Sequence, residues 1–238
     1  MHRFLLPLLS TLLITACGSA APEPDRCRTK LIPPPQESLH IVDRPIDFGK
    51  ERVELTKAYI KTHYGKEVKD IAITPKIIVL HYTAIDSADA SFRTMKPQKL
   101  RGRKDISKAS ALNVSVQFMV DKDGTVYRLM PENWMGRHVI GLNYYAIGVE
   151  NVAKDAKHLT PAQVKANIAL VKYLKSKYPT ITYLIGHHEY LRMEQTPLWL
   201  ERDKNYRTYK VDPGERFMRQ VRAGVKALKL KEPPKGIK

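Results

Sequence analysis

The chain of 238 residues is 43% hydrophobic and carries 41 Lys and Arg against 24 Asp and Glu, a net charge of +17. That length and apolar content favour one globular domain over two small ones and argue against a disordered chain. The positive charge exceeds what a packed domain needs and indicates a polyanionic neighbour, such as nucleic acid, anionic lipid or a carboxylate-rich cell wall.

Residues 1–16 have the pattern of an export signal. Arg3 provides a basic start, a leucine-rich run follows, and small residues precede Cys17. The run is too short to span a bilayer comfortably. The segment ITAC at 14–17 resembles the lipobox of bacterial lipoproteins, which implies cleavage before Cys17 and lipidation of its sulfur and new amino group. The alternative is an ordinary signal peptide followed by an accidental cysteine.

Residues 17–47 are predicted to form a flexible, lipid-anchored tether, because they are rich in proline and lack apolar periodicity. Gly18, in place of aspartate, resembles the outer-membrane sorting pattern of enteric bacteria. We therefore expect an exported protein anchored to the outer membrane and facing the periplasm of a Gram-negative bacterium. Cys27 has no partner if Cys17 carries lipid, and its role stays open.

A single domain is expected over residues 48–230, beginning with a helix at 51–64 that ends at Gly65. The β-branched run at 77–80 predicts a buried strand that delivers His81 at its end. Residues 114–120 and 125–129 predict two strands joined by a hairpin, since Asp-Gly at 123–124 suits such a turn. Residues 146–152 predict a further strand.

In the second half, Thr160 and Gln163 form a capping box that begins a helix, and residues 182–189 predict a strand. A last helix follows Asp-Pro-Gly at 212–214, and a basic tail is expected at 231–238. Strands and helices therefore alternate, which predicts an α/β domain with a single mixed β-sheet flanked by helices.

Side chains that bind metals stand at predicted strand ends and loops: His81, the pair His187 and His188, and Asp212. Two neutral imidazoles and a carboxylate, with a fourth position left for water, form a known type of catalytic zinc site. Each also has an ordinary alternative, because His81 fits a core histidine and Asp212, before a proline, fits a helix N-cap. Neighbours on an extended segment point to opposite sides, so only one histidine of the pair can face a metal.

Six segments occur in an order that resembles the type 2 N-acetylmuramoyl-L-alanine amidase family, whose relatives include phage-lysozyme amidases and animal peptidoglycan recognition proteins. They are IVLHYTA at 78–84, VSVQF at 114–118, DGTVY at 123–127, AIGVE at 146–150, GHHE at 186–189 and KVDPG at 210–214. The resemblance implies zinc-dependent hydrolysis of the amide bond between N-acetylmuramic acid and L-alanine in peptidoglycan, for cell-wall turnover or recycling.

By position, the resemblance implies that His81, His187 and Asp212 are the zinc ligands, and that His188 packs beside them. It also implies that Glu150 is the catalytic acid and base. The alternative for Glu150 is a structural ion pair with a lysine.

Lys210 is expected beside the metal as a catalytic residue. Lys210 and Asp212 share a face in an extended chain, whereas Val211 is expected to point into the core. There Lys210 would stabilise the oxyanion of the tetrahedral intermediate. Without the resemblance, a solvated surface lysine would be the favoured interpretation.

The chain departs from the family pattern at two positions. Gln117 stands where relatives commonly have a histidine, with a consequence that stays open, and Val116 stands where the phage branch has a catalytic tyrosine. Glu150 is therefore the sole candidate acid and base. His138 and Asn143 lie where the family lines its substrate groove, although His138 could instead be a surface histidine.

Two long segments, 85–112 and 191–209, lack a strong pattern, and loops of such length are usually functional or disordered. We interpret the second as a wall of the substrate cleft. Trp199 within it fits either stacking on a sugar or packing in the core.

Two rival functions remain. A non-catalytic peptidoglycan-binding protein of the same fold would not need the full set of ligands plus Glu150 and Lys210. A nucleic-acid binder would need an aromatic and basic motif, which is not seen. The expected partners are therefore peptidoglycan or muropeptides and, through Cys17, a membrane, with a monomer as the expected state.

Overall fold

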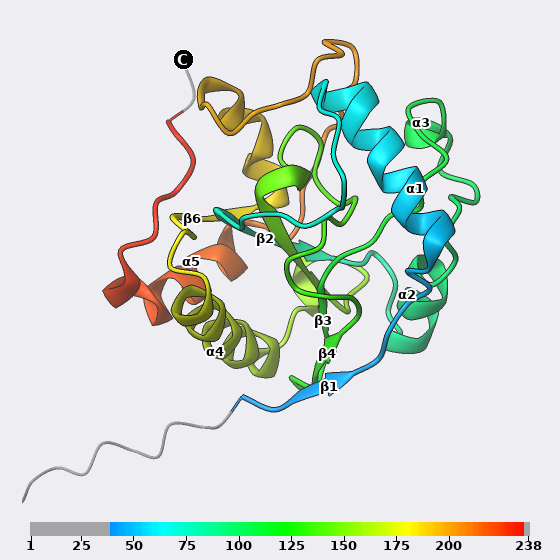
Figure 1. Ribbon diagram of the computed structural model, residues 1–238. Helices are drawn as coiled ribbons and strands as arrows, with labels where there is room; N and C mark the ends of the chain where they lie inside the picture. The colour runs from blue at the N-terminus through cyan, green and yellow to red at the C-terminus, as the bar shows by residue number, and fades with distance from the viewer. Residues whose placement is uncertain (1–38, 236–238) are drawn as a thin grey trace, which may run out of the picture. The chain divides into compact units, whose positions relative to one another are not determined.

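The computed structural model of the protein describes residues 39–235, which contain a six-stranded sheet (Figure 1). The strand order is β1-β4-β3-β5-β2-β6. The strands are β1 (Ile41–Asp43), β2 (Ile77–Tyr82), β3 (Phe118–Val120), β4 (Val126–Arg128), β5 (Ala146–Asn151) and β6 (Tyr183–Gly186). Strands β3 and β4 pair antiparallel and all other neighbours pair parallel, so the predicted mixed sheet is confirmed.

One face of the sheet is covered by α4 (Pro161–Lys177) and α5 (Glu215–Gly224) (Figure 1). Helix α4 begins with the predicted capping box, in which Thr160 Oγ1 accepts from the Gln163 amide at 3.1 Å and Gln163 Oε1 accepts from the Thr160 amide at 3.0 Å. The buried cluster on this face contains Ile78 and Leu80 of β2.

The other face is covered by α1 (Lys50–Tyr59), which continues as the π-helix η1 (Ile60–Tyr64), and by α3 (Lys104–Ser107). Ile77 and Val79 of β2 face this second cluster. Because side chains alternate along a strand, His81 follows Val79 onto the same face. Glu150 lies opposite His81 in the parallel register of β2 and β5, so both functional candidates project from this side.

The remaining described elements are α2 (Ala88–Met95) and the short 3-10 helices η2 (Asn143–Tyr145), η3 (Ala156–His158), η4 (His187–Gln195) and η5 (Lys226–Leu228). No helix in the described part combines the length and apolarity needed to cross a bilayer.

The strand predicted over 182–189 ends at Gly186, and the 3-10 helix η4 begins at His187. The carboxylate of Glu189 is responsible, because its Oε2 accepts from the Gly186 amide at 2.8 Å and its two oxygens pair with Arg192 and Arg222. The predicted strand at 114–120 is also too long. Its first residues bond to the 134–137 segment, as in the bond from the Ser115 amide to the Arg137 carbonyl.

Both predicted domain boundaries are wrong in detail. Residues 41–43, assigned to the tether, form β1 and pair with β4, and Ile46 is buried in the core. At the other end, Lys231 of the predicted tail bridges to Tyr183 of β6. The export signal at 1–16 and residues 17–38 of the predicted tether, including Cys17 and Cys27, lie outside the described residues.

Candidate functional site

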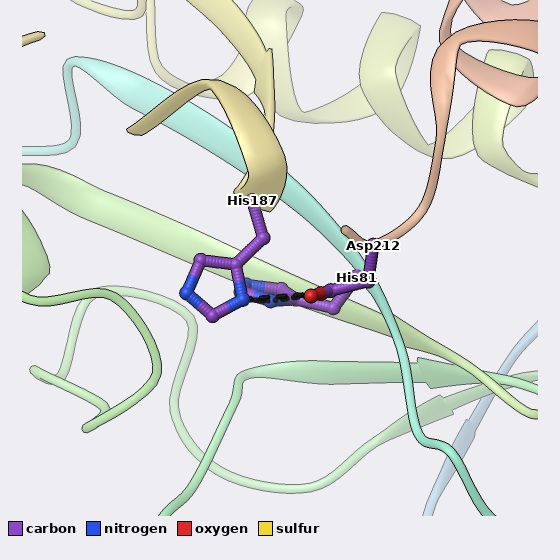
Figure 2. A group of neighbouring side chains, drawn as sticks. All are labelled: His81, His187 and Asp212. Carbon is purple, nitrogen blue, oxygen red and sulfur yellow. Dashed lines mark hydrogen bonds and ion pairs between the residues drawn. The ribbon is translucent and has the colours of Figure 1, made fainter. Parts of the chain in front are cut away.

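Three side chains from three elements converge on one point (Figure 2). His81 lies near the end of β2, His187 directly follows β6, and Asp212 lies in the loop before α5. His81 Nδ1 is 2.9 Å from His187 Nδ1 and 3.2 Å from Asp212 Oδ2, and His187 Nδ1 is 3.0 Å from Asp212 Oδ2. The three residues are only 1%, 7% and 9% exposed, respectively.

This triangle fits a zinc ion. Tetrahedral ligands at about 2.0–2.1 Å from zinc are separated from one another by about 3.3 Å, close to the distances between the three donor atoms. Two imidazole nitrogens and a carboxylate oxygen are also a common catalytic zinc set. With no cation or shared proton between them, three such electron-pair donors would repel one another.

Burial and mutual contact set the charge states of His187 and Asp212. Burial lowers the pKa of His187 to about 4, which keeps its imidazole neutral. Burial alone would raise the pKa of Asp212, but contact with His187 and His81 outweighs this and holds that pKa well below its usual range. A neutral imidazole and an ionised carboxylate are the protonation states in which these two groups can bind a metal.

The Asp212 loop is held by the second histidine of the pair. The His188 amide donates to the Asp212 carbonyl at 2.8 Å, and His188 Nδ1 lies 3.1 Å from the same oxygen. A Cβ at Gly186 would lie 2.6 Å from the His188 ring, so only glycine leaves room for it. His188 therefore touches the Asp212 backbone and lies outside the donor triangle.

The strand end that carries His81 is fixed by two buried asparagines that sequence reasoning missed. Asn151 Nδ2 donates to the His81 carbonyl at 3.0 Å, and Asn167 Nδ2 donates to Asn151 Oδ1 at 2.7 Å. Asn167 is a polar residue on the buried side of α4, which is the one signal that could have indicated its role.

Glu150 projects into the same cavity as the donors. Its Oε2 is buried without a hydrogen-bond partner. Burial is the main cause that raises the pKa of Glu150 to about 7, with the negative charge of Asp212 acting in the same direction. A carboxyl group with this pKa can both accept and donate a proton near neutral pH. The described residues offer Glu150 no ion pair with a lysine, the alternative left open by its sequence.

Lys210 also lines the cavity and is half-buried. Burial is the main cause that lowers the pKa of Lys210, and repulsion from Arg103 acts in the same direction. Val211 between Lys210 and Asp212 is 52% exposed, so the expectation that it points into the core is wrong. The reason is that this segment forms the rim of the cavity, where the outer side chain meets solvent.

His138 and Asn143 line the same cavity. His138 Nδ1 lies 3.0 Å from His81 Nε2, on the side of the imidazole away from the donor triangle. Asn143 is buried, and its Oδ1 accepts from the amides of His138 at 2.9 Å and Val139 at 2.8 Å. His138 is therefore not a free surface histidine, and the predicted contact of both residues with substrate stays a prediction.

Gln117 does not reach the donors. Its Nε2 donates to the Trp134 carbonyl at 2.6 Å and its Oε1 accepts from the Gly148 amide at 2.7 Å. Gln117 thus links β5 to the loop at 134. An amide side chain suits this link because it offers a donor and an acceptor in fixed positions.

The cavity has a volume of about 530 Å³, and both pattern-poor segments contribute to its walls. Ser91 and Arg103 come from the first segment, and Tyr206 and Tyr209 come from the second. Trp199 instead packs against Tyr190, with the rings 6.0 Å apart, and forms part of the core on this face. Sequence reasoning missed Arg103 and Tyr209, which sit in stretches without periodicity.

Comparisons with known proteins find matches over the part of the chain that contains this site. A family model described as N-acetylmuramoyl-L-alanine amidase matches residues 72–215, a range that includes all of the metal and catalytic candidates. The endolysin of Escherichia phage T7 is 31% identical over 117 residues, 44% of this chain and 77% of the relative. The endolysin of Klebsiella phage KP32 is 37% identical over 84 residues, 33% of this chain and 55% of the relative.

Among solved structures, the N-acetylmuramoyl-L-alanine amidase LysC from Clostridium intestinale is 23% identical with a TM-score of 0.47. The match covers 82% of this chain and all of that one.

Proposed function

Because this chain belongs to the N-acetylmuramoyl-L-alanine amidase family, we propose that it hydrolyses the amide bond between N-acetylmuramic acid and the L-alanine of the stem peptide in peptidoglycan. The observation that carries the proposal is the meeting of three metal-binding side chains with Glu150 and Lys210 around one cavity. A zinc ion is the proposed cofactor.

His81 Nδ1, His187 Nδ1 and Asp212 Oδ2 would hold the ion. When bound, zinc supplies a Lewis-acid charge and lowers the pKa of water toward about 7. The donors are kept rigid by contacts outside the triangle, including Asn151 on the His81 carbonyl and His188 on the Asp212 carbonyl.

Glu150 would move the proton. Its carboxylate accepts the proton of the attacking water and then delivers it to the departing alanine nitrogen. The same group serves both steps because burial brings its pKa to about 7. Position 116 holds valine where the phage branch of the family has a catalytic tyrosine. Glu150 would compensate for this difference by both accepting and returning the proton.

Lys210 would stabilise the negative charge that develops on the carbonyl oxygen as the bond is attacked. Lys210 and Arg103 both line the cavity, which gives its wall two positively charged side chains. A substrate with free carboxylates, such as a stem peptide, fits these charges.

The test is incubation of the purified protein with muropeptides, with and without a chelator, and analysis of the products by mass spectrometry. We expect a free stem peptide and a sugar fragment, formed only when metal is present. A protein that binds peptidoglycan without turnover would give intact substrate in both samples, and that outcome would refute the proposed activity.

We also propose that the protein is an exported lipoprotein anchored at Cys17 to the outer membrane, where it acts in cell-wall turnover or recycling. The support is the sequence pattern of residues 1–18. The protein should fractionate with membranes, whereas Cys17→Ala should release it. A Cys17→Ala protein that still fractionated with membranes would contradict the anchor.

A further inference from the structure

We infer that His138 fixes the tautomer of His81, so that His81 Nδ1 always presents a lone pair to the metal. This makes His138 a positioning residue of the metal centre and gives it a role that does not depend on contact with substrate. The inference rests on the metal site of the proposed function.

The assignment follows from a chain of hydrogen bonds that begins at a backbone carbonyl. His138 Nε2 lies 3.4 Å from the Ala146 carbonyl oxygen, which can only accept, so this nitrogen carries a hydrogen. In a neutral imidazole the other nitrogen is then an acceptor. His138 Nδ1 therefore accepts from His81 Nε2, 3.0 Å away.

The consequence for His81 is direct. Because its Nε2 donates to His138, a neutral His81 has no hydrogen on Nδ1, the atom that faces His187 and Asp212. Ligating histidines usually donate their other ring nitrogen to a carboxylate, a carbonyl or water, which orients the ring and raises its basicity. Here a second imidazole takes that place.

The surroundings of His138 are shaped to hold its ring in this position. A Cβ added at Gly148 would lie 2.8 Å from both Cγ and Nδ1 of His138, so strand β5 has room for the ring only because residue 148 is glycine. The backbone of His138 is itself held by Asn143, whose Oδ1 accepts from the amides of residues 138 and 139.

The experiment measures the zinc affinity of the full protein by chelator competition. His138→Leu keeps the bulk but removes the acceptor, and it should weaken zinc binding about 10- to 100-fold. His138→Asn places an amide oxygen near the position of Nδ1 and should restore most of the affinity. Gly148→Ala, which displaces the ring, should weaken zinc binding as His138→Leu does, and the two changes combined should cost no more than either alone.

His158→Leu is the matched control, because His158 is exposed and pairs only with Asp155, away from the cavity. It should leave zinc affinity unchanged. A second readout is the imidazole N–H resonance of His81 Nε2 in the zinc-loaded protein, which should persist in His138→Asn and exchange rapidly in His138→Leu.

Two results would overturn the inference. If His138→Leu bound zinc as tightly as the parent and raised only KM for muropeptides, His138 would contact substrate and not position His81. If the parent itself bound no zinc, the proposed metal site and the inference would fail together. If the parent bound zinc and His138→Leu did not weaken that binding, only the inference would fail and the metal site would stand.

Discussion

The carboxyl group of Glu150 lies where ionisation is costly, because one oxygen is buried without a partner and the pKa is raised to about 7. Glu150→Gln keeps the shape but cannot transfer a proton. We expect kcat to fall about 10²- to 10⁴-fold. Zinc content and thermal stability should stay close to those of the parent. An active Glu150→Gln protein with unchanged kcat would exclude Glu150 as the acid and base.

Lys210 gives a second prediction at the level of one side chain. Lys210→Met retains the aliphatic stem but removes the ammonium group from the cavity. Loss of one partner of a developing oxyanion should lower kcat about 10²- to 10³-fold. KM should change far less, and Lys204→Met, at an exposed position outside the cavity lining, serves as control. A change confined to KM would assign Lys210 to substrate binding.

Much of this site could be predicted from residue order, and the rest could not for an identifiable reason. His81, His187 and Asp212 each sit in a short distinctive segment, and they do meet in the structure. The contacts that hold them, such as Asn151 with Asn167 and His138 with His81, join residues with no shared motif. Such pairs arise only when strands and helices pack, so spacing along the chain carries no sign of them.

At the level of elements, the buried side chain of His63 connects the two long segments of the cavity wall, 85–112 and 191–209. His63 of η1 has Nδ1 3.0 Å from Glu201 and Nε2 3.1 Å from the Ala109 carbonyl. His63→Leu would leave the buried Glu201 side chain with only the Asp203 amide, which donates to it at 2.9 Å. Removing one member of a buried pair typically costs up to about 3–5 kcal/mol, and the remaining amide should keep the loss toward the lower end. Urea unfolding should show this loss. The double variant His63→Leu with Glu201→Leu should recover much of it, and purely additive losses would show that the two side chains are not coupled.

A second link joins helix α4 to the segment after β4. Glu132 is buried and accepts from Tyr173 at 3.0 Å, with Lys177 at 2.9 Å and Arg128 at 3.0 Å. Burial alone would raise the pKa of Glu132, but these partners outweigh it and lower that pKa below its ordinary value.

A lowered folded-state pKa means that Glu132 contributes stability that is complete above the unfolded pKa of about 4.3 and is lost as pH falls through the folded pKa. Glu132→Gln should therefore reduce the free energy of unfolding at pH 7 and flatten its decline below about pH 4.3. Chemical unfolding at several pH values measures both effects. An unchanged slope in acid would show that other carboxylates dominate acid unfolding.

The strands that were predicted well are the central ones. Residues 77–80 and 146–149 are continuous runs without a polar side chain, because β2 and β5 have neighbours on both edges and helices on both faces. Strand β1 was missed because it is a three-residue edge strand beside prolines, with a pattern no different from that of a linker. Its place in the sheet depends on pairing with β4, a partner far along the chain.

For the whole molecule, zinc should act as a stabilising ligand. If the folded state alone binds the ion, free zinc at 100 times Kd adds about 2.7 kcal/mol to the free energy of unfolding. For a domain of this size that corresponds to a rise in Tm of about 5–10 °C. Calorimetry with and without chelator measures it, with His187→Ala as the variant that should lose the response. An equal rise in Tm for His187→Ala would place the zinc elsewhere.

The parallel pairing of β2 with β6 also bears on how the chain folds. The two histidines of the donor triangle are 106 residues apart, and His81 and Asp212 are 131 apart. Closing loops of this length costs entropy before any contact compensates for it, which makes parallel pairings of distant strands slow steps. The β3–β4 hairpin can form early, because its strands are adjacent in sequence. The donor triangle is complete only once β6 has paired with β2. The rate at which a refolding chain binds zinc would therefore report the rate at which β6 pairs with β2.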